Sequence, residues 1–147
     1  MVSKYWFKSA QFKLQDGEEE QTNPDCFGKS LAEWLSTEFS KLGYETEVIP
    51  EDWGWCVMCE RNDFLLWIGC GSMITTEVNE GDTDSLPDVN DIVWHVFTEI
   101  EIPFFMLKSH MKKLLGQLDL SSPVNKLNKE INAVLCSNES ISFCEEP

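Results

Sequence analysis

The chain has 147 residues, 42% of them hydrophobic and 12% aromatic, enough to fill the core of one ordinary domain. With 11 basic and 26 acidic residues its formal net charge is −15, which disfavours direct contact with nucleic-acid phosphate or an anionic membrane surface. The amino-terminal segment lacks the apolar run of a signal peptide, and no stretch reaches the roughly 20 apolar residues of a membrane helix, so we expect a cytoplasmic protein with one domain, 1–147.

The first elements along the chain are a strand region and an amphipathic helix. Residues 4–14 are predicted to form a strand or strand pair, and an acidic turn follows. Residues 24–43 are predicted to form a helix, with Asn23 or Asp25 capping its start and Gly43 ending it. One face of this helix is expected to be buried, because its apolar residues recur at helical spacing: Phe27, Leu31, Trp34, Leu35, Phe39 and Leu42.

A β region occupies the middle of the sequence. Residues 44–50 predict a short strand, and 64–77 predict a nearly continuous apolar strand. Between them, 52–60 alternates in a way that places four residues on one face: Trp53, Trp55, Val57 and Cys59. Because residues 61–63 can form a turn, the simplest topology is a hairpin of the strands 52–60 and 64–77.

An acidic segment separates this hairpin from the next strand. Residues 77–91 hold six acidic residues and no basic one, and their Gly, Asp, Ser and Pro content is typical of a solvated loop. In the following strand, 91–102, His95 shares one face with Val93 and Phe97. The other face is apolar, with Ile92, Trp94, Val96, Ile100 and Ile102.

Two helices and a last short strand complete the expected fold. The helix over 103–118 carries an apolar stripe of Phe104, Leu107, Met111, Leu114, Leu115 and Leu118. The helix over 121–138 carries a second stripe of Val124, Leu127, Ile131, Val134 and Leu135. With a short strand at 140–146, the order of elements predicts a single α+β domain, a mostly antiparallel sheet covered on one face by about three helices.

The six cysteines include one CxxC pair, Cys56 and Cys59. Zinc-binding pairs lie on tight turns that direct both sulfur atoms at one metal ion, whereas residues three apart on a strand point to opposite faces. Since the segment is predicted to be a strand, we expect reduced structural thiols, no metal site and no cofactor.

The run "PEDWGWCVMCE" gives two further possibilities for a site. Carboxylates at Glu51 and Asp52 beside Trp53 and Trp55 are a combination found in enzymes that process sugars. Adjacent residues usually diverge in direction, however, and no partner carboxylate can be nominated. A junction between helix and sheet, with Gly54 at a bend, is the simpler interpretation.

The segments "KLGYETEVIPEDWGW" and "FLLWIGCG", with the late helix pair, resemble small bacterial proteins of uncharacterised function that share an EDWGW-like segment. This resemblance implies kinship and no particular activity. In size and acidity the chain also resembles immunity proteins that neutralise bacterial toxins, a similarity of type that assigns no functional residue.

These observations favour an acidic, non-enzymatic protein that inhibits a basic protein partner, such as a toxin or a defence nuclease, by occluding its active site. Two alternatives are a phage or mobile-element anti-defence inhibitor that mimics DNA, and a small ligand-binding domain or enzyme built on the Trp and carboxylate cluster. The predicted contact residues are Glu51, Asp52, Trp53, Glu77, Glu80, Asp82, Asp84 and Asp88.

Overall fold

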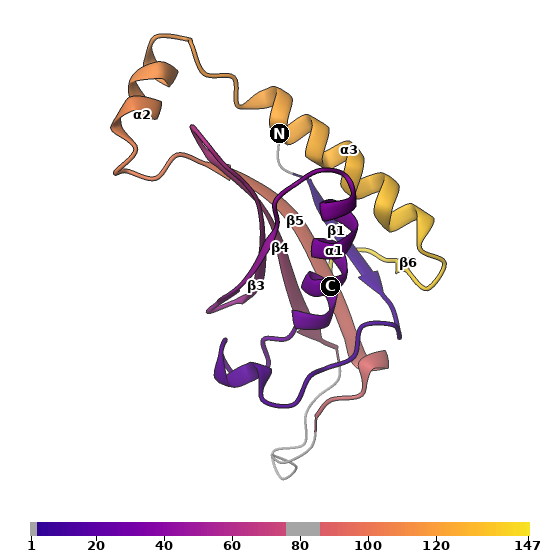
Figure 1. Ribbon diagram of the computed structural model, residues 1–147. Coiled ribbons are helices and arrows are strands. Elements are labelled where there is room, and N and C mark those ends of the chain that lie inside the picture. Colours follow the sequence, from indigo (N-terminus) through magenta and orange to yellow (C-terminus); the bar gives the residue numbers. More distant parts are fainter. Residues whose placement is uncertain (1–2, 76–85) are drawn as a thin grey trace.

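The centre of the molecule is a six-stranded sheet with the order β2-β3-β4-β5-β1-β6 (Figure 1). The computed structural model describes residues 3–75 and 86–147. Every neighbouring pair of strands is antiparallel. The strands are β1 (Lys4–Lys8), β2 (Glu47–Glu51), β3 (Gly54–Arg61), β4 (Leu65–Ile74), β5 (Ile92–Glu101) and β6 (Ser142–Phe143).

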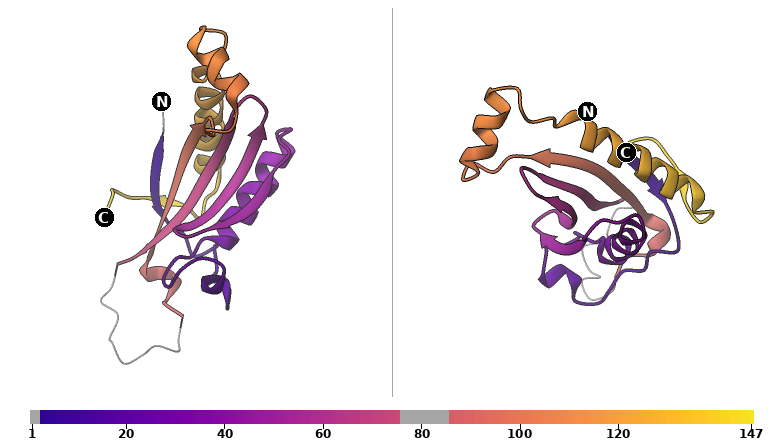
Figure 2. Two further views of the ribbon diagram at one scale, coloured as in Figure 1. Left: turned by 90° about the vertical axis from the view of Figure 1, so that its left-hand side faces the viewer. Right: turned by 45° about the horizontal axis from the view of Figure 1, so that its top comes forward.

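Two helices cover one face of this sheet. Helix α1 (Lys29–Lys41) packs across β2, β3 and β4, and α3 (Ser121–Ser137) packs along β5. Both helices contribute side chains to the same buried cluster, so they lie on the same side, behind the strands in the left view of Figure 2. The remaining helical elements are η1 (Glu18–Glu20), η2 (Val89–Asp91) and α2 (Leu107–Leu114). The predicted α+β fold, an antiparallel sheet with helices on one face, is confirmed.

The core follows the alternation of the strands. Trp55, Val57 and Cys59 of β3 point into it, as do the even-numbered residues of β5 from Ile92 to Val96. The hairpin of β3 and β4 is confirmed, with a bulge between Met58 and Glu60. Helix α3 buries Val124, Leu127, Ile131 and Leu135, four residues of its predicted stripe.

The start of α1 is capped by a residue that the sequence did not indicate. The prediction of Asn23 or Asp25 as the cap is wrong, because the helix begins at Lys29 with Gly28 as its N-cap residue. Buried Glu18 supplies the acceptor instead: one carboxylate oxygen accepts hydrogen bonds from the backbone N–H groups of Gly28 (2.9 Å) and Lys29 (3.1 Å). Gly43 follows the helix with a φ of 101°, as expected of a residue that ends a helix.

Trp53 does not share a face with Trp55, contrary to the predicted alternation. Residues 52 and 53 form the turn between β2 and β3, and the strand begins only at Gly54, whose φ is 154°. A Cβ atom at Gly54 would lie 2.5 Å from the carbonyl oxygen of Cys70, so only glycine fits this turn. The turn places the Trp53 ring on the side of the sheet that α1 and α3 leave free.

Helix α2 is shorter than predicted and projects beyond the end of the strands (Figures 1 and 2). Of its predicted apolar stripe only Leu118 packs against the core, and the other five residues are exposed, because the core of this domain is already closed by α1 and α3. The predicted first strand is also shorter and ends at Lys8. Within residues 3–75 and 86–147, no helix combines the length and apolar character needed to cross a membrane.

Candidate functional site

No described helix covers the face of the sheet opposite α1 and α3 (Figure 2, left). This face carries a group of large side chains. We call it the open sheet face. Strand register brings its residues together: Trp6 lies opposite His95, His95 opposite Gly71, and Phe97 opposite Gly69. Its large members are Trp6, Trp53, Trp67, Met73, His95 and Phe97.

Five of these rings form a continuous aromatic ladder. The imidazole of His95 stacks on Trp6 with centroids 3.8 Å apart and planes within 1°, and it contacts Phe97 at 4.9 Å. Phe97 contacts Trp53 at 5.3 Å and Trp67 at 5.8 Å, and the two tryptophans stack on each other at 5.8 Å. The ladder therefore runs from β1 across β5 and β4 to the β2–β3 turn.

Two glycines of β4 shape this surface in different ways. A Cβ atom at Gly69 would lie 2.2 Å from Cζ of Phe97, so the ring can lie flat across β4 only because residue 69 has no side chain. A Cβ atom at Gly71 would meet no atom within 4 Å. Gly69 thus accommodates the ladder, and Gly71 leaves an empty space beside it.

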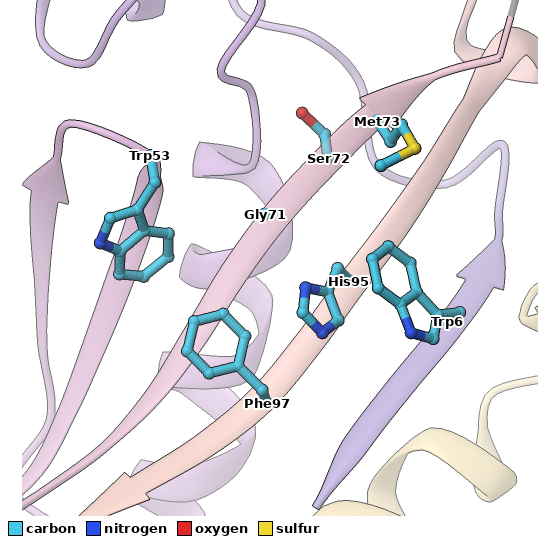
Figure 3. A pocket seen from close by; sticks show the side chains of 7 residues that line it. All are labelled: Trp6, Trp53, Gly71, Ser72, Met73, His95 and Phe97. Atoms are coloured by element: carbon cyan, nitrogen blue, oxygen red, sulfur yellow. The ribbon is translucent and has the colours of Figure 1, made fainter. Parts of the chain in front are cut away.

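That space is part of a hollow of about 250 Å³ (Figure 3). Trp53 lies on one side and Trp6 and His95 on the other, with Gly71 between them (Figure 3). The lining residues are Trp6, Trp53, Gly71, Ser72, Met73, His95 and Phe97. The hollow is therefore mainly aromatic, a composition typical of sites that take an apolar or flat group.

His95 lines this hollow, and its buried ring nitrogen Nε2 has no hydrogen-bond partner among the described residues. Burial lowers the pKa of His95 below its ordinary value, and the nearby Lys4 ammonium lowers it further, while the Glu146 carboxylate has a smaller opposing effect. A buried polar atom without a partner is costly, and a bound molecule that reached it would remove this cost.

Carboxylates of β2, of the β2–β3 turn and of the last part of β5 border the ladder. Glu99 lies opposite Trp67 in the sheet, and Glu101 lies opposite Leu65. Glu47 lies opposite Met58 and forms an ion pair with Arg61 at 2.5 Å. We call Glu47, Glu51, Asp52, Glu99 and Glu101 the acidic rim. The β1 side is basic, with Lys4 opposite Phe97 and Lys8 four residues further along the strand.

The structure describes four of the eight predicted contact residues. Glu51 ends β2 and Asp52 begins the turn, both exposed, and neither carboxylate lines the hollow. Trp53 is 38% exposed and lies in the ladder. Asp88 is exposed and accepts a hydrogen bond from the backbone N–H of Asn90, away from those three in sequence. The other four lie outside the described residues: Glu77, Glu80, Asp82 and Asp84.

Sequence reasoning missed most of the ladder. Trp6, Trp67 and Phe97 were assigned to strands, but nothing local indicates that three strands place them side by side. The signal that the sequence does contain is the shared face of Val93, His95 and Phe97, which is opposite the apolar face of β5. An aromatic residue on the second face of a strand shows that this face is not simply solvated.

The CxxC cysteines are thiols within the sheet. Cys56 and Cys59 are both buried, and burial raises the pKa of each to about 12, with Glu51 adding to the effect at Cys56. A thiol with such a pKa holds its proton at neutral pH and is a poor nucleophile. Within the part of the chain that the structure describes, no three His, Cys, Asp or Glu side chains are grouped so that they could hold a metal ion.

Comparison with known proteins gives no family for this chain: no family model, no curated protein and no solved structure matches it. The resemblance of the EDWGW segment to small bacterial proteins therefore stays a prediction.

Proposed function

We propose that this protein binds a basic protein partner through the open sheet face and inhibits it by occlusion, without catalysing a reaction. The observation that carries the proposal is the aromatic ladder bordered by carboxylates of β2 and β5. Aromatic side chains are the residues that most often dominate binding energy, and surrounding charges guide association and select the partner. Both elements lie on the one face of the sheet that the described helices leave free.

The net charge of −15 supports a cationic partner. A protein that handles nucleic acid contacts phosphate with lysines and arginines, and these same groups would pair with the acidic rim. The partner class is therefore a toxin or defence nuclease, and the protein acts as its immunity protein. In this mechanism Trp53 anchors the contact, while Glu51, Asp52, Glu99 and Glu101 pair with cationic side chains of the partner.

The described arrangement gives less support to the alternatives. A DNA mimic needs acidic residues in rows spaced like phosphates, whereas the rim residues flank an aromatic centre. An enzyme based on the Trp and carboxylate cluster needs Glu51, Asp52 and a tryptophan to converge in a pocket. The hollow is lined by Trp53 without either carboxylate.

Affinity capture from the native host, with products of neighbouring genes as first candidates, tests the proposal when it is combined with two matched variants. The first, Glu99→Lys/Glu101→Lys, reverses charge on the rim. The control, Glu20→Lys/Glu139→Lys, makes the same change in net charge at exposed positions of η1 and the α3–β6 connection.

We expect the rim variant to bind the captured partner about tenfold more weakly at low salt than the control. An exposed ion pair contributes roughly 0.2–1 kcal/mol, and reversal replaces attraction by repulsion. Raising the ionic strength should weaken binding of the unmodified protein and reduce the difference between the variants. Equal affinities for the two variants, or binding that does not depend on salt, would contradict the proposal.

A further inference from the structure

Helix α2 and the residues before it expose more apolar surface than any other part of the described chain. Phe104 is 87% exposed and Leu114 is 85% exposed. Large exposed apolar patches are unusual on monomers and mark interaction sites, and six strongly exposed apolar residues are gathered in this one segment. We call this group the α2 patch: Phe104, Phe105, Leu107, Met111, Leu114 and Leu115.

The α2 patch is held in a defined position away from its own core. The Lys112 ammonium forms an ion pair with Asp63 of the β3–β4 turn at 3.0 Å. The His110 ring Nε2 lies 3.0 Å from the carbonyl oxygen of Pro103, which fixes the start of the helix. Ser109 is buried, so one side of α2 faces the body while its apolar side faces outward. These contacts present the patch beyond the end of the strands (Figure 1).

The charge of α2 indicates what covers it. Its eight residues include Lys108, Lys112 and Lys113 and no acidic residue, in a chain whose net charge is −15. A suitable surface must therefore be apolar and bordered by carboxylates. The open sheet face has this chemistry, with the aromatic ladder at its centre and the acidic rim at its side.

We infer that the α2 patch of one copy docks on the open sheet face of a second copy, and that the exchange is reciprocal. This inference rests on the proposed role of the open sheet face as a site for basic polypeptides, and it names a second copy of this chain as one occupant. A reciprocal exchange closes a twofold dimer without leaving an unpaired patch. Because a buried aromatic side chain covers roughly 150–250 Å², the four phenylalanines of two patches bury about 600–1,000 Å². A matching area on the two sheet faces brings the total to the roughly 1,200–2,000 Å² of a stable interface.

The inferred dimer covers the surface that the basic partner needs. The partner then competes with α2 of the second copy for the open sheet face. In the absence of the partner, the dimer shields the aromatic ladder from water. Dissociation of the dimer precedes inhibition, so the apparent affinity for the partner, expressed per total chain, is lower where most of the chain is dimeric.

Sedimentation velocity with three full-length variants tests the inference. Phe104→Ser/Leu114→Ser removes two exposed anchors from α2 and keeps its lysines. Glu99→Lys/Glu101→Lys repels α2 from the face. Leu42→Ser is the matched control, because Leu42 is a single exposed leucine, 48% exposed, at the end of α1. Far-UV circular dichroism and urea unfolding confirm that each variant is folded.

We expect the unmodified protein and the Leu42 control to form a species of twice the 16.9 kDa chain mass. The α2 variant and the rim variant should each dimerise at least tenfold more weakly. An equimolar mixture of these two variants should regain a heterodimer, because one intact α2 then meets one intact face. Dimers that persist in the rim variant would show α2 pairing with α2 and would overturn the inference.

A single 16.9 kDa species at millimolar concentration of the unmodified protein would also overturn the inference. Flotation of that monomer with anionic lipid vesicles, lost in the α2 variant, would identify a membrane surface as the occupant instead. Affinity capture tests the proposed function independently of dimer formation. If the α2 variant is monomeric and still binds the basic partner, the proposed function stands even where the dimer inference fails.

Discussion

The pair Gly69→Ala and Gly71→Ala tests whether the aromatic ladder depends on an empty position in β4. Both residues are in the same strand and neither has a positive φ, so alanine fits the backbone at each. At Gly69 the new methyl group would lie 2.2–2.6 Å from three atoms of the Phe97 ring, well inside contact distance. At Gly71 it would meet nothing within 4 Å.

The expected magnitudes follow from these contacts. Phe97 must swing away from Gly69→Ala, which disrupts its ring contacts with Trp53, Trp67 and His95. Each aromatic pair contributes roughly 0.5–1.5 kcal/mol and overpacking costs roughly 1–3 kcal/mol, so we expect a loss of about 2 kcal/mol in the free energy of unfolding. Gly71→Ala should be neutral or stabilise by up to about 1 kcal/mol, because alanine restricts the unfolded chain.

Urea unfolding followed by far-UV circular dichroism measures both values, and near-UV circular dichroism reports the tryptophan environment. In a Phe97→Ala background the methyl group at residue 69 has no ring to displace, so Gly69→Ala should then cost less than about 0.5 kcal/mol, as for an unstrained surface substitution. Equal stabilities of the two single variants, or an unchanged cost of Gly69→Ala without the Phe97 ring, would refute the account of the ladder.

Three further predictions follow from buried polar groups and thiols. Glu18→Ala should lower the free energy of unfolding by about 3 kcal/mol, because N–H groups at the start of α1 lose their acceptor. Glu18→Gln should cost less, because the amide keeps one acceptor oxygen. Equal urea midpoints for the two variants would contradict this prediction. Since the pKa of His95 is lower in the folded than in the unfolded state, the unfolded chain binds more protons between these two values, and stability should fall as pH falls through that window. His95→Gln should reduce this fall in a pH series of urea titrations, and an unchanged pH dependence in that variant would contradict the prediction. Iodoacetamide should label the exposed Cys136 and Cys144 in the native protein, as detected by mass spectrometry. Rapid labelling of Cys56, Cys59 or Cys70 in the native protein would contradict their burial.

The sequence predicted the strands and α3 because their periodicity is set by burial on one side. Alternation along β5 and the four-residue spacing of α3 both reflect packing against one core, which is a property that local sequence records. The same reasoning was wrong about Trp53, because a turn at residues 52 and 53 breaks the alternation just before β3 begins. The cap of α1 was missed because Glu18, the acceptor, lies 10 residues before the N–H donor of Gly28.

Helix α2 shows the limit of inferring burial from a stripe. Its apolar spacing is as regular as that of α3, yet Phe104 and Leu114 face solvent. An apolar stripe indicates that a helix face is suited to pack on apolar surface. It does not indicate whether its own chain provides that surface. The aromatic ladder was out of reach for a different reason: Trp6 and His95 are 89 residues apart in sequence, and only the insertion of β1 beside β5 stacks them.

Hydroxyl-radical footprinting of the protein, alone and with its captured basic partner, tests most directly whether the open sheet face is the contact surface. Oxidation of Trp53 and Met73, which are partly exposed on that face, should fall at least several-fold in the complex. Phe143, 49% exposed and packed against Tyr5 and Phe7 on the other side of the sheet, should be oxidised as before. Unchanged oxidation of Trp53 and Met73 in a saturated complex would contradict the account.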